Sequence, residues 1–291
     1  RVVTTLAGPA AGSSESGSLD SSDGKGTSAR FLYPQGLISD GTNLYVTDTN
    51  NNKIRKIVIS SKVVTTLAGP AELSDASGST DGTGTASGAA ARFHYPFGIT
   101  IDGDYLYVAD RENHKIRRVH KSTGEVTTFA GSGTAGSADD DTGTDATFYA
   151  PEGITNDGTN LYVSGTQNQK IRKIVIETGV VTTLAGSGDT GSADGTGAAA
   201  SFRYPRAITS DGTNLYVTDS NNHSIRKVVI STGKVTTIAG SGSAGSADGT
   251  STSATFSAPE GIVSDSTNLY VLDTQNHTIR KISLSVTETA D

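Results

Sequence analysis

The chain has 291 residues, of which 34% are hydrophobic and 35 are glycine, and it carries a net charge of −7. It contains no Cys, Met or Trp, which excludes a disulfide framework, a Cys-ligated metal and a thiol nucleophile. No apolar run approaches the roughly 18 residues of a membrane helix, and the acidic balance disfavours a surface that binds nucleic acid, because such surfaces depend on Lys and Arg.

The first residue is Arg1 rather than methionine. We therefore expect the chain to be a cleaved product or a segment of a longer protein. The lack of easily oxidised side chains suits an extracellular or cell-surface location.

One sequence pattern repeats five times. Each copy has four short segments rich in β-branched and aromatic residues, separated by Gly, Asp, Asn and Ser, which is typical of strands joined by tight turns. In the fourth copy the expected strands are Ala207–Ser210, Leu215–Thr218, Ile225–Ile230 and Val235–Ala239. Five such four-stranded units, with almost no helix, predict an all-β, five-bladed β-propeller.

The order of the segments predicts how the propeller closes. The chain begins with a strand-like segment, Val2–Ala7, and its last full strand is Ile279–Leu284, the third of its blade. We expect the N-terminal strand to complete the fifth blade and remove two open sheet edges. The predicted single domain spans 1–291, with repeat units at about 9–69, 70–131, 132–186, 187–240 and 241–291 plus 1–8.

The repeated motifs resemble those of a known family. Pro-x-Gly-Ile, Asn-Leu-Tyr-Val-x-Asp and Asn-His-x-Ile-Arg-Lys, the last clearest at Asn222–Lys227, are similar to the NHL repeat, especially its bacterial secreted or surface type. The resemblance covers essentially the whole chain. It departs from the family in having five blades where six are usual, and in Gly165, which stands where other blades have Asp. It implies a binding or scaffolding platform more often than an enzyme, although the family includes lyases.

Strand alternation places the long inter-blade loops and the second-to-third hairpins on one face, named here the long-loop face. Loops of this length are usually functional or mobile. An Asp precedes the Phe of each loop. It fits either a calcium-binding turn or an Asp-Gly turn in which the carboxylate forms hydrogen bonds with the backbone of the same turn. The absence of EF-hand spacing favours the second. These aspartates are Asp23, Asp81, Asp140, Asp194 and Asp248; the best metal candidate is the loop with Asp139, Asp140, Asp141 and Asp145.

Two repeated polar positions favour structural roles. His114, His223 and His277 share one hairpin position with Asn52 and Gln169, which suits a polar turn residue better than a metal ligand. One Arg per third strand fits either the RNA-binding face of some NHL domains or a pair with the second-strand Asp, as in Asp219 and Arg226. The acidic net charge favours the pair. The five arginines are Arg55, Arg117, Arg172, Arg226 and Arg280.

The residue after each inter-blade proline varies most between copies, which is where an asymmetric site can be encoded. We predict a ligand site at the mouth of the central channel, with Arg206 between two glutamates that border open acidic notches and with tyrosines before three of the prolines. The alternative is a solvated ion pair at the rim. The predicted site residues are Gln35, Phe97, Glu152, Arg206, Glu260, Tyr33, Tyr95 and Tyr204.

These observations favour a non-enzymatic recognition or scaffold module, secreted or on the cell surface, that binds a protein or glycan through its long-loop face. No catalytic residue, metal ligand or cofactor is assigned, and neither nucleic acid nor membrane insertion is expected. Two alternatives stay open: a lyase or hydrolase of the NHL-propeller type centred on the channel, and a propeller segment of a larger extracellular adhesin or filament.

Overall fold

The computed structural model describes residues 2–9, 21–70, 76–83 and 90–284. These residues form five antiparallel β-sheets joined by turns and loops, and their only helical elements are three-residue 3₁₀ turns. The fold is an all-β five-bladed β-propeller, as predicted, and each sheet is one blade. The chain divides into two compact units, Arg1–Ala135 and Gly136–Asp291, which are described separately.

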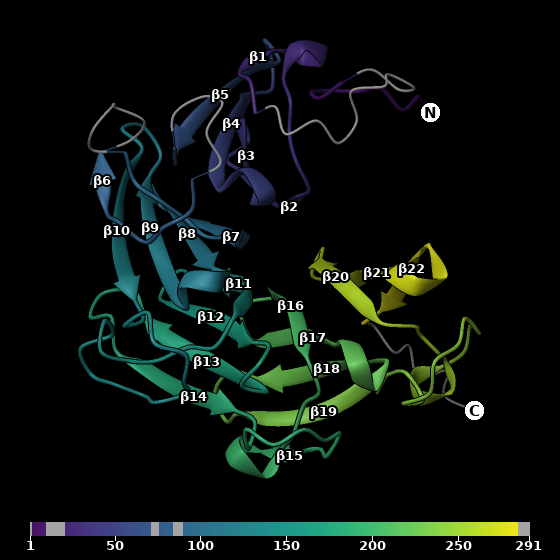
Figure 1. Ribbon diagram of the computed structural model, residues 1–291. Coiled ribbons are helices and arrows are strands. Elements are labelled where there is room, and N and C mark those ends of the chain that lie inside the picture. Colours follow the sequence, from purple (N-terminus) through teal and green to yellow (C-terminus); the bar gives the residue numbers. More distant parts are fainter. Residues whose placement is uncertain (1, 10–20, 71–75, 84–89, 285–291) are drawn as a thin grey trace. The chain divides into compact units, whose positions relative to one another are not determined.

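The first unit holds two sheets (Figure 1), each with four main strands and a two-residue strand added beside the fourth. Their spatial orders are β1-β5-β4-β3-β2 and β6-β10-β9-β8-β7. The strands of the first sheet are β1 (Gly24–Lys25), β2 (Pro34–Ser39), β3 (Asn43–Asp48), β4 (Lys53–Val58) and β5 (Val63–Ala68); those of the second are β6 (Gly82–Thr83), β7 (Pro96–Asp102), β8 (Tyr105–Asp110), β9 (Lys115–His120) and β10 (Glu125–Ala130).

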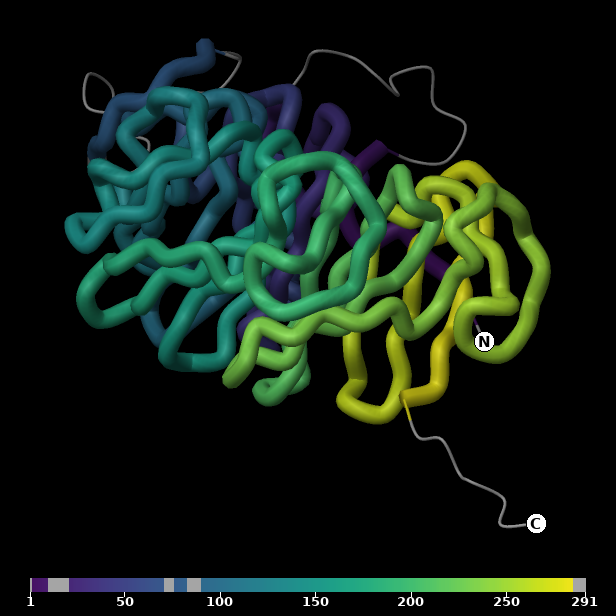
Figure 2. The backbone as a smooth tube through the Cα atoms, turned by 90° about the horizontal axis from the view of Figure 1, so that it is seen from below, coloured from purple at the N-terminus to yellow at the C-terminus, as the bar shows by residue number. Residues whose placement is uncertain are grey.

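The second unit holds three sheets, with orders β11-β12-β13-β14, β15-β19-β18-β17-β16 and β20-β21-β22. In Figure 2 the yellow strands of the last sheet follow the yellow-green loop that leads into them. The strands are β11 (Pro151–Asn156), β12 (Asn160–Gly165), β13 (Lys170–Val175), β14 (Val181–Ala185), β15 (Gly195–Thr196), β16 (Pro205–Ser210), β17 (Asn214–Asp219), β18 (Ser224–Val229), β19 (Lys234–Ala239), β20 (Pro259–Ser264), β21 (Asn268–Asp273) and β22 (Thr278–Ser283).

The four strands predicted in the fourth repeat are confirmed as β16 to β19, with ends that differ by at most two residues. They form because turn-forming sequences separate β-branched runs. Asp211 begins the first turn, where its carboxylate accepts the backbone N–H groups of Thr213 and Asn214 at 2.8 and 2.7 Å. The second-to-third hairpin contains a 3₁₀ turn in four of the five sheets, and the third sheet has a plain turn there. The 3₁₀ turns are η2 (Thr49–Asn51), η3 (Arg111–Asn113), η5 (Ser220–Asn222) and η7 (Thr274–Asn276).

The apolar core lies between neighbouring sheets of each unit. One cluster joins Tyr162 and Ile171 of the third sheet to Phe202, Leu215 and Val228 of the fourth, all fully buried. The Phe that precedes the proline is part of the core in four repeats, as predicted, since Phe93, Phe148, Phe202 and Phe256 are all buried, whereas Phe31 is partly buried against the cluster of the first sheet.

The first strands of neighbouring sheets, here called inner strands, approach one another closely. In the second unit β11 contacts β16, and β16 contacts β20. A Cβ atom at Gly153 would overlap the carbonyl oxygen of Arg206. This close approach explains why a glycine lies two residues after the proline. It also fixes the distance between neighbouring inner strands at the residue that directly follows the proline.

The N-terminal segment contacts the first sheet as a fourth strand of the preceding sheet would. Residues 2–9 are not assigned as a strand, and the described part of the fifth sheet has three strands. Leu6 and Ala7 pack against the apolar cluster of the first sheet, and the Gly8 N–H donates to the carbonyl oxygen of Gly26 at 3.1 Å, as the Gly186 N–H after β14 donates to that of Gly197 at 3.1 Å. The pairing of this segment with the fifth sheet stays a prediction.

Candidate functional site

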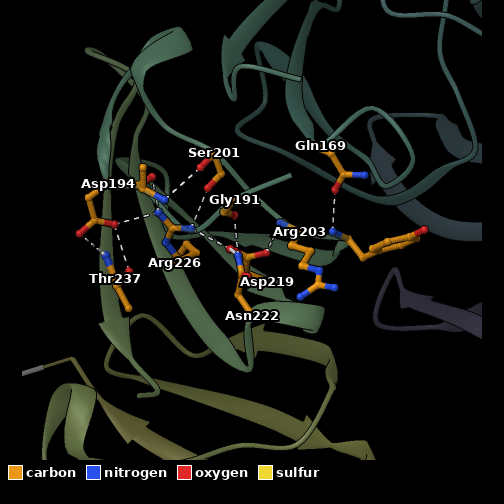
Figure 3. Close-up of polar contacts among 11 residues, drawn as sticks. Gln169, Gly191, Asp194, Ser201, Arg203, Asp219, Asn222, Arg226 and Thr237 are labelled. Atoms are coloured by element: carbon orange, nitrogen blue, oxygen red, sulfur yellow. Dashed lines mark hydrogen bonds and ion pairs between the residues drawn. The ribbon is translucent and has the colours of Figure 1, made fainter. Parts of the chain in front are cut away.

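The third-strand arginines are buried in polar networks. Arg226 on β18 donates to Asp219 at the end of β17 at 2.7 Å and to the loop residue Asp194 at 2.8 Å (Figure 3). It also donates to the carbonyl oxygens of Ser201 and Ala193 at 3.0 and 2.9 Å. Its guanidinium carbon lies 5.1 Å from the centre of the Phe202 ring, a stacking arrangement that suits Arg.

Burial and hydrogen bonding act on the two carboxylates differently. Burial raises the pKa of Asp219, although bonds from Arg203, Asn222 and Arg226 act against it. For Asp194, burial is outweighed by bonds from Thr237 and Arg226, which leave the pKa below its ordinary value. Arg226 thus joins a fully buried carboxylate to a partly exposed one and ties the inter-sheet loop to its own sheet.

The same arrangement recurs in three other sheets. Arg55 binds Asp48 and Asp23, and Arg117 binds Asp110 and Asp81; Arg280 repeats the pattern with two more aspartates. The side chains of Arg55, Arg117, Arg172 and Arg226 have no exposed surface. The structural interpretation of these arginines therefore holds, since a buried guanidinium cannot contact a phosphate backbone.

The loop aspartates have a role that neither sequence interpretation named. In the first four sheets the carboxylate accepts a bond from the Arg and another from a fourth-strand Thr, as Asp23 does from Thr66 at 2.9 Å, and Asp248 accepts the bond from Arg280. In the third sheet this residue is Asp139, not Asp140 as predicted, because that loop has one more residue before its Phe. Across the parts of the chain that the structure describes, no three His, Asp or Glu side chains gather closely enough to hold a metal ion.

The third sheet lacks one carboxylate of this network, because Gly165 stands where the other sheets have Asp. Arg172 pairs there with Asp139 through a 2.7 Å contact, and burial lowers the pKa of Arg172. The Asn168 side chain replaces the other function of the missing Asp by accepting the N–H of Tyr149 at 2.8 Å, as Asp219 accepts that of Arg203. An Asn occupies this hairpin position in all five repeats, and that repetition is the sequence signal from which its structural role could have been predicted.

The hairpin position shared by His, Asn and Gln connects neighbouring sheets. Each residue there has a left-handed backbone, with φ between 50° and 56°. Asn52 accepts the N–H of Tyr95 at 2.8 Å, Gln169 that of Tyr204 at 2.6 Å, and His223 Nδ1 that of Ala258 at 3.1 Å. The prediction of a polar turn residue is confirmed, with this added linking role.

These three side-chain acceptors hold a strained part of the backbone in place, at the residue before the proline of the next sheet. The residue before each inter-sheet proline has a positive φ between 46° and 56°, a conformation that non-glycine residues adopt rarely and that a following proline disfavours. Strain of this kind persists only where surrounding contacts impose it, and it concentrates at functional sites. The strained residues are Tyr33, Tyr95, Ala150, Tyr204 and Ala258.

The residues after three of these prolines form a charged triad, defined as Glu152 on β11, Arg206 on β16 and Glu260 on β20. Arg206 Nη1 pairs with Glu260 Oε1, and Arg206 Nε lies 3.6 Å from Glu152 Oε2. The predicted position of Arg206 between two glutamates is therefore confirmed. The surroundings differ from the prediction of two open acidic notches: Glu152 is only 2% exposed, because the close approach of the inner strands covers it.

The backbone beneath the triad is fixed by hydroxyl groups of the preceding sheet. Ser164 donates to the carbonyl oxygen of Arg206, and Thr218 donates to that of Glu260 at 3.1 Å. Thr166 does the same for Pro205 at 2.8 Å. Arg206 and Glu260 thus present partly exposed charges from a rigid backbone.

The remaining predicted site residues divide between the units. Tyr204 lies beside the triad in sequence, while Tyr33, Gln35, Tyr95 and Phe97 hold the equivalent positions in the first unit. Tyr33 and Tyr95 both expose their rings to solvent. In the described parts of the chain, no helix has both the length and the apolar character needed to cross a bilayer.

Sequence comparison finds relatives in plants and animals. The chain is 31% identical over 92% of its length to Protein SUPPRESSOR OF QUENCHING 1, chloroplastic, of Arabidopsis thaliana, and it covers 26% of that protein. It is 29% identical over 98% of its length to NHL repeat-containing protein 2 of Gallus gallus, of which it covers 42%. The chain therefore spans less than half the length of these curated relatives. No protein-family model matches it.

Among solved structures, an auxiliary nutrient binding protein from Bacteroides ovatus has a similar fold, with a TM-score of 0.57 and 18% identity, covering 86% of this chain and 68% of that one. The five repeated sheets, their shared Arg–Asp networks and these relatives together define the class. The chain belongs to the NHL-repeat β-propeller family.

Proposed function

We propose that this chain is a recognition module of a secreted or cell-surface protein and that it binds a protein or glycan partner on its long-loop face. The observation that carries the proposal is the charged triad. The third-strand arginines are used in the same internal way from sheet to sheet, whereas Arg206 joins glutamates of two neighbouring sheets.

The triad has the features of a preorganised polar site. Its backbone is held by Ser164 and Thr218, and the strained residues before Pro205 and Pro259 are anchored by Gln169 and His223. A partner that meets Arg206 and Glu260 finds a cation and an anion whose positions are already fixed, so little entropy is lost on binding. The carboxylates and hydroxyls of a protein or glycan surface are suited to such a pair.

The long inter-sheet loops extend this surface. Inner strands β11, β16 and β20 each begin where such a loop ends, so the triad and these loops lie at the same end of the strands. The loops supply variable contacts, while the sheets supply a rigid frame, a division of roles common in binding proteins. The fold shared with a nutrient binding protein is compatible with this role but does not identify a ligand.

The proposal is tested with purified protein, an array of glycans and a panel of purified extracellular proteins. The affinity of each partner found is then measured for the wild type and for the double variant Arg206→Ala, Glu152→Gln. We expect the double variant to bind at least about tenfold more weakly, as loss of a charged hydrogen bond implies.

The matched control is the double variant Glu177→Ala, Lys234→Ala. It removes one negative and one positive charge from exposed positions near the third-to-fourth turns, at the other end of the strands. Wild-type affinity is expected for this control. Wild-type affinity in the triad variant, for every partner found, would contradict the proposal.

A further inference from the structure

The first unit has a group of aromatic and uncharged polar side chains where its two inner strands begin. These strands, β2 and β7, contact each other. The group, here called the aromatic rim, lies one or two residues before an inter-sheet proline or directly after it, at the positions that hold the charged triad and its neighbours in the second unit. The rim residues are Tyr33, Gln35, His94, Tyr95 and Phe97.

The fold does not require the rings of Tyr33 and Tyr95. Tyr33 is 66% exposed and Tyr95 is 40% exposed, so neither ring fills the core. The backbone does not require them either, because Ala150 and Ala258 hold the same position with φ of 48° and 46°, compared with 49° and 54° for the tyrosines. An exposed ring on a strained backbone is typical of a residue that acts outside the fold.

The backbone that carries Tyr95 is fixed on both sides. The N–H of His94 donates to the Asp110 carboxylate at 2.8 Å. After Tyr95, the carbonyl oxygen of Pro96 accepts the hydroxyl of Thr49 at 2.7 Å. The N–H of Tyr95 is itself bonded to the preceding sheet. The ring therefore starts from a rigid support, and a ligand that stacks on it loses little additional entropy.

The chemistry of the rim matches that of a sugar. The C–H faces of a pyranose ring are flat and apolar and stack on an exposed aromatic ring, while its hydroxyls both donate and accept hydrogen bonds. The rings of His94 and Tyr95 lie together, with centroids 5.5 Å apart, and Gln35 is exposed. An amide and a neutral imidazole each have a donor and an acceptor, as sugar hydroxyls require.

Charge and size favour an uncharged sugar over other partners. The residues after the prolines are Gln35 and Phe97 here, whereas the second unit has Glu152, Arg206 and Glu260 at these positions. Two exposed rings are few for a stable protein interface, which buries about 800 Å² on each partner. They suffice for a sugar, whose site needs an apolar surface and a small number of polar groups.

We propose that the aromatic rim binds an uncharged sugar ring of a glycan, with Tyr33 and Tyr95 stacked on its C–H faces and Gln35 bonded to its hydroxyls. The inference rests on the proposed function in so far as the chain is a recognition module. It goes further by choosing a glycan over a protein and by assigning residues outside the charged triad.

The proposal is tested by titration calorimetry of the intact chain with cellohexaose, xylohexaose, mannohexaose, maltohexaose, laminarihexaose and chitohexaose. We expect saturable binding of at least one of them. Tyr95→Ala should weaken that binding about tenfold, because it removes the stacking ring. Tyr95→Phe keeps the ring and should bind as the wild type does. Both variants should keep the wild-type melting temperature, since alanine already occupies the equivalent position in two other sheets.

Nitration by tetranitromethane identifies the location. The bound sugar should slow the nitration of Tyr33 and Tyr95, measured by mass spectrometry of peptides. Tyr270 on β21 is the internal control, because its ring has a comparable exposure of 37% and it lies outside the rim. Its rate should not change when the sugar binds.

Two results would overturn the proposal: no saturable binding of any of these sugars, or equal affinity of the wild type and Tyr95→Ala. If Tyr95→Ala weakens binding of a protein alone and no sugar binds, the rim is a protein site and the proposal is wrong. The triad variant Arg206→Ala, Glu152→Gln separates this proposal from the proposed function. A sugar that this variant binds normally supports the rim without the triad, and a partner lost only in this variant supports the triad and contradicts the rim.

Discussion

Arg226 and Asp219 form a 2.7 Å ion pair in which neither side chain has any exposed surface. The pair joins β17 to β18, and a second bond from Arg226 to Asp194 fixes the loop that precedes the inner strand. A charge in this environment is tolerated only because its partner and hydrogen bonds are complete. The stability of the blade therefore depends on this pair more than on any exposed charge.

Asp219→Ala should lower the free energy of unfolding by about 3 kcal/mol or more, because it leaves the buried Arg226 without its closest carboxylate. Urea unfolding followed by circular dichroism measures the change. Asp248→Ala is the matched control: it removes an equally Arg-bound but exposed carboxylate, and it should change the value by no more than about 0.5 kcal/mol. Equal effects of the two variants would show that burial of the pair is unimportant.

Gly165→Asp should raise the free energy of unfolding by about 1 kcal/mol, because it restores a second carboxylate beside the buried Arg172. A Cβ atom at this position would lie 3.3 Å from the Asn168 Cβ, so a small shift of Asn168 is required. Thermal unfolding measures the gain. Gly165→Ala adds the Cβ without the charge and should give no gain; a lower melting temperature for Gly165→Asp would refute the expected pairing.

Tyr216 makes the stability sensitive to alkaline pH. Burial, together with its 2.8 Å bond to Asp211, raises the pKa of Tyr216 from 10.0 to about 12. The folded state thus favours the protonated phenol: the contribution is complete below pH 10 and is lost as the pH rises towards 12. In Tyr216→Phe, urea unfolding should show a smaller loss of stability across this range than in the wild type.

The control for this pH experiment is Tyr33→Phe, which removes the hydroxyl from an exposed ring. It should leave the alkaline slope of the wild type unchanged. If Tyr216→Phe has the wild-type slope as well, then the bond to Asp211 does not link folding to the protonation of Tyr216.

Arg206→Ala should destabilise the chain by about 1–2 kcal/mol, more than Glu260→Ala, because it removes a cation from the buried carboxylate of Glu152. Adding Glu152→Gln to Arg206→Ala should recover most of the loss, since the buried charge is then gone. A double-mutant cycle on unfolding free energies measures this coupling. Additive effects would mean that Arg206 and Glu152 do not interact.

The repeat made much of this structure predictable. The positions of β16 to β19 follow from turn residues and β-branched runs, and the pairing of Asp219 with Arg226 follows from their places across one hairpin. The order of Glu152, Arg206 and Glu260 was also readable, because equivalent residues of successive sheets lie beside one another. These inferences needed only strand alternation and the register of the repeat.

Other features depend on distances that a repeat does not encode. The burial of Glu152 follows from how closely β11 and β16 approach, and the choice of Asp139 over Asp140 depends on the path of one loop. The N-terminal segment has the sequence of a fourth strand, and its Leu6 and Ala7 pack against the first sheet as fourth strands pack against the sheet that follows them. Its pairing with the fifth sheet stays a prediction.

The buried Arg–Asp pairs stabilise the sheets, and we propose that the charged triad binds the partner. The most direct test measures the melting temperature and the affinity for a partner found in the array on two double variants. We predict that Arg206→Ala, Glu152→Gln loses at least about tenfold in affinity at a nearly unchanged melting temperature. Arg226→Ala, Asp219→Ala should melt earlier and, while folded, bind as the wild type does. The reverse pattern, with affinity lost only when the buried pair is removed, would contradict the account.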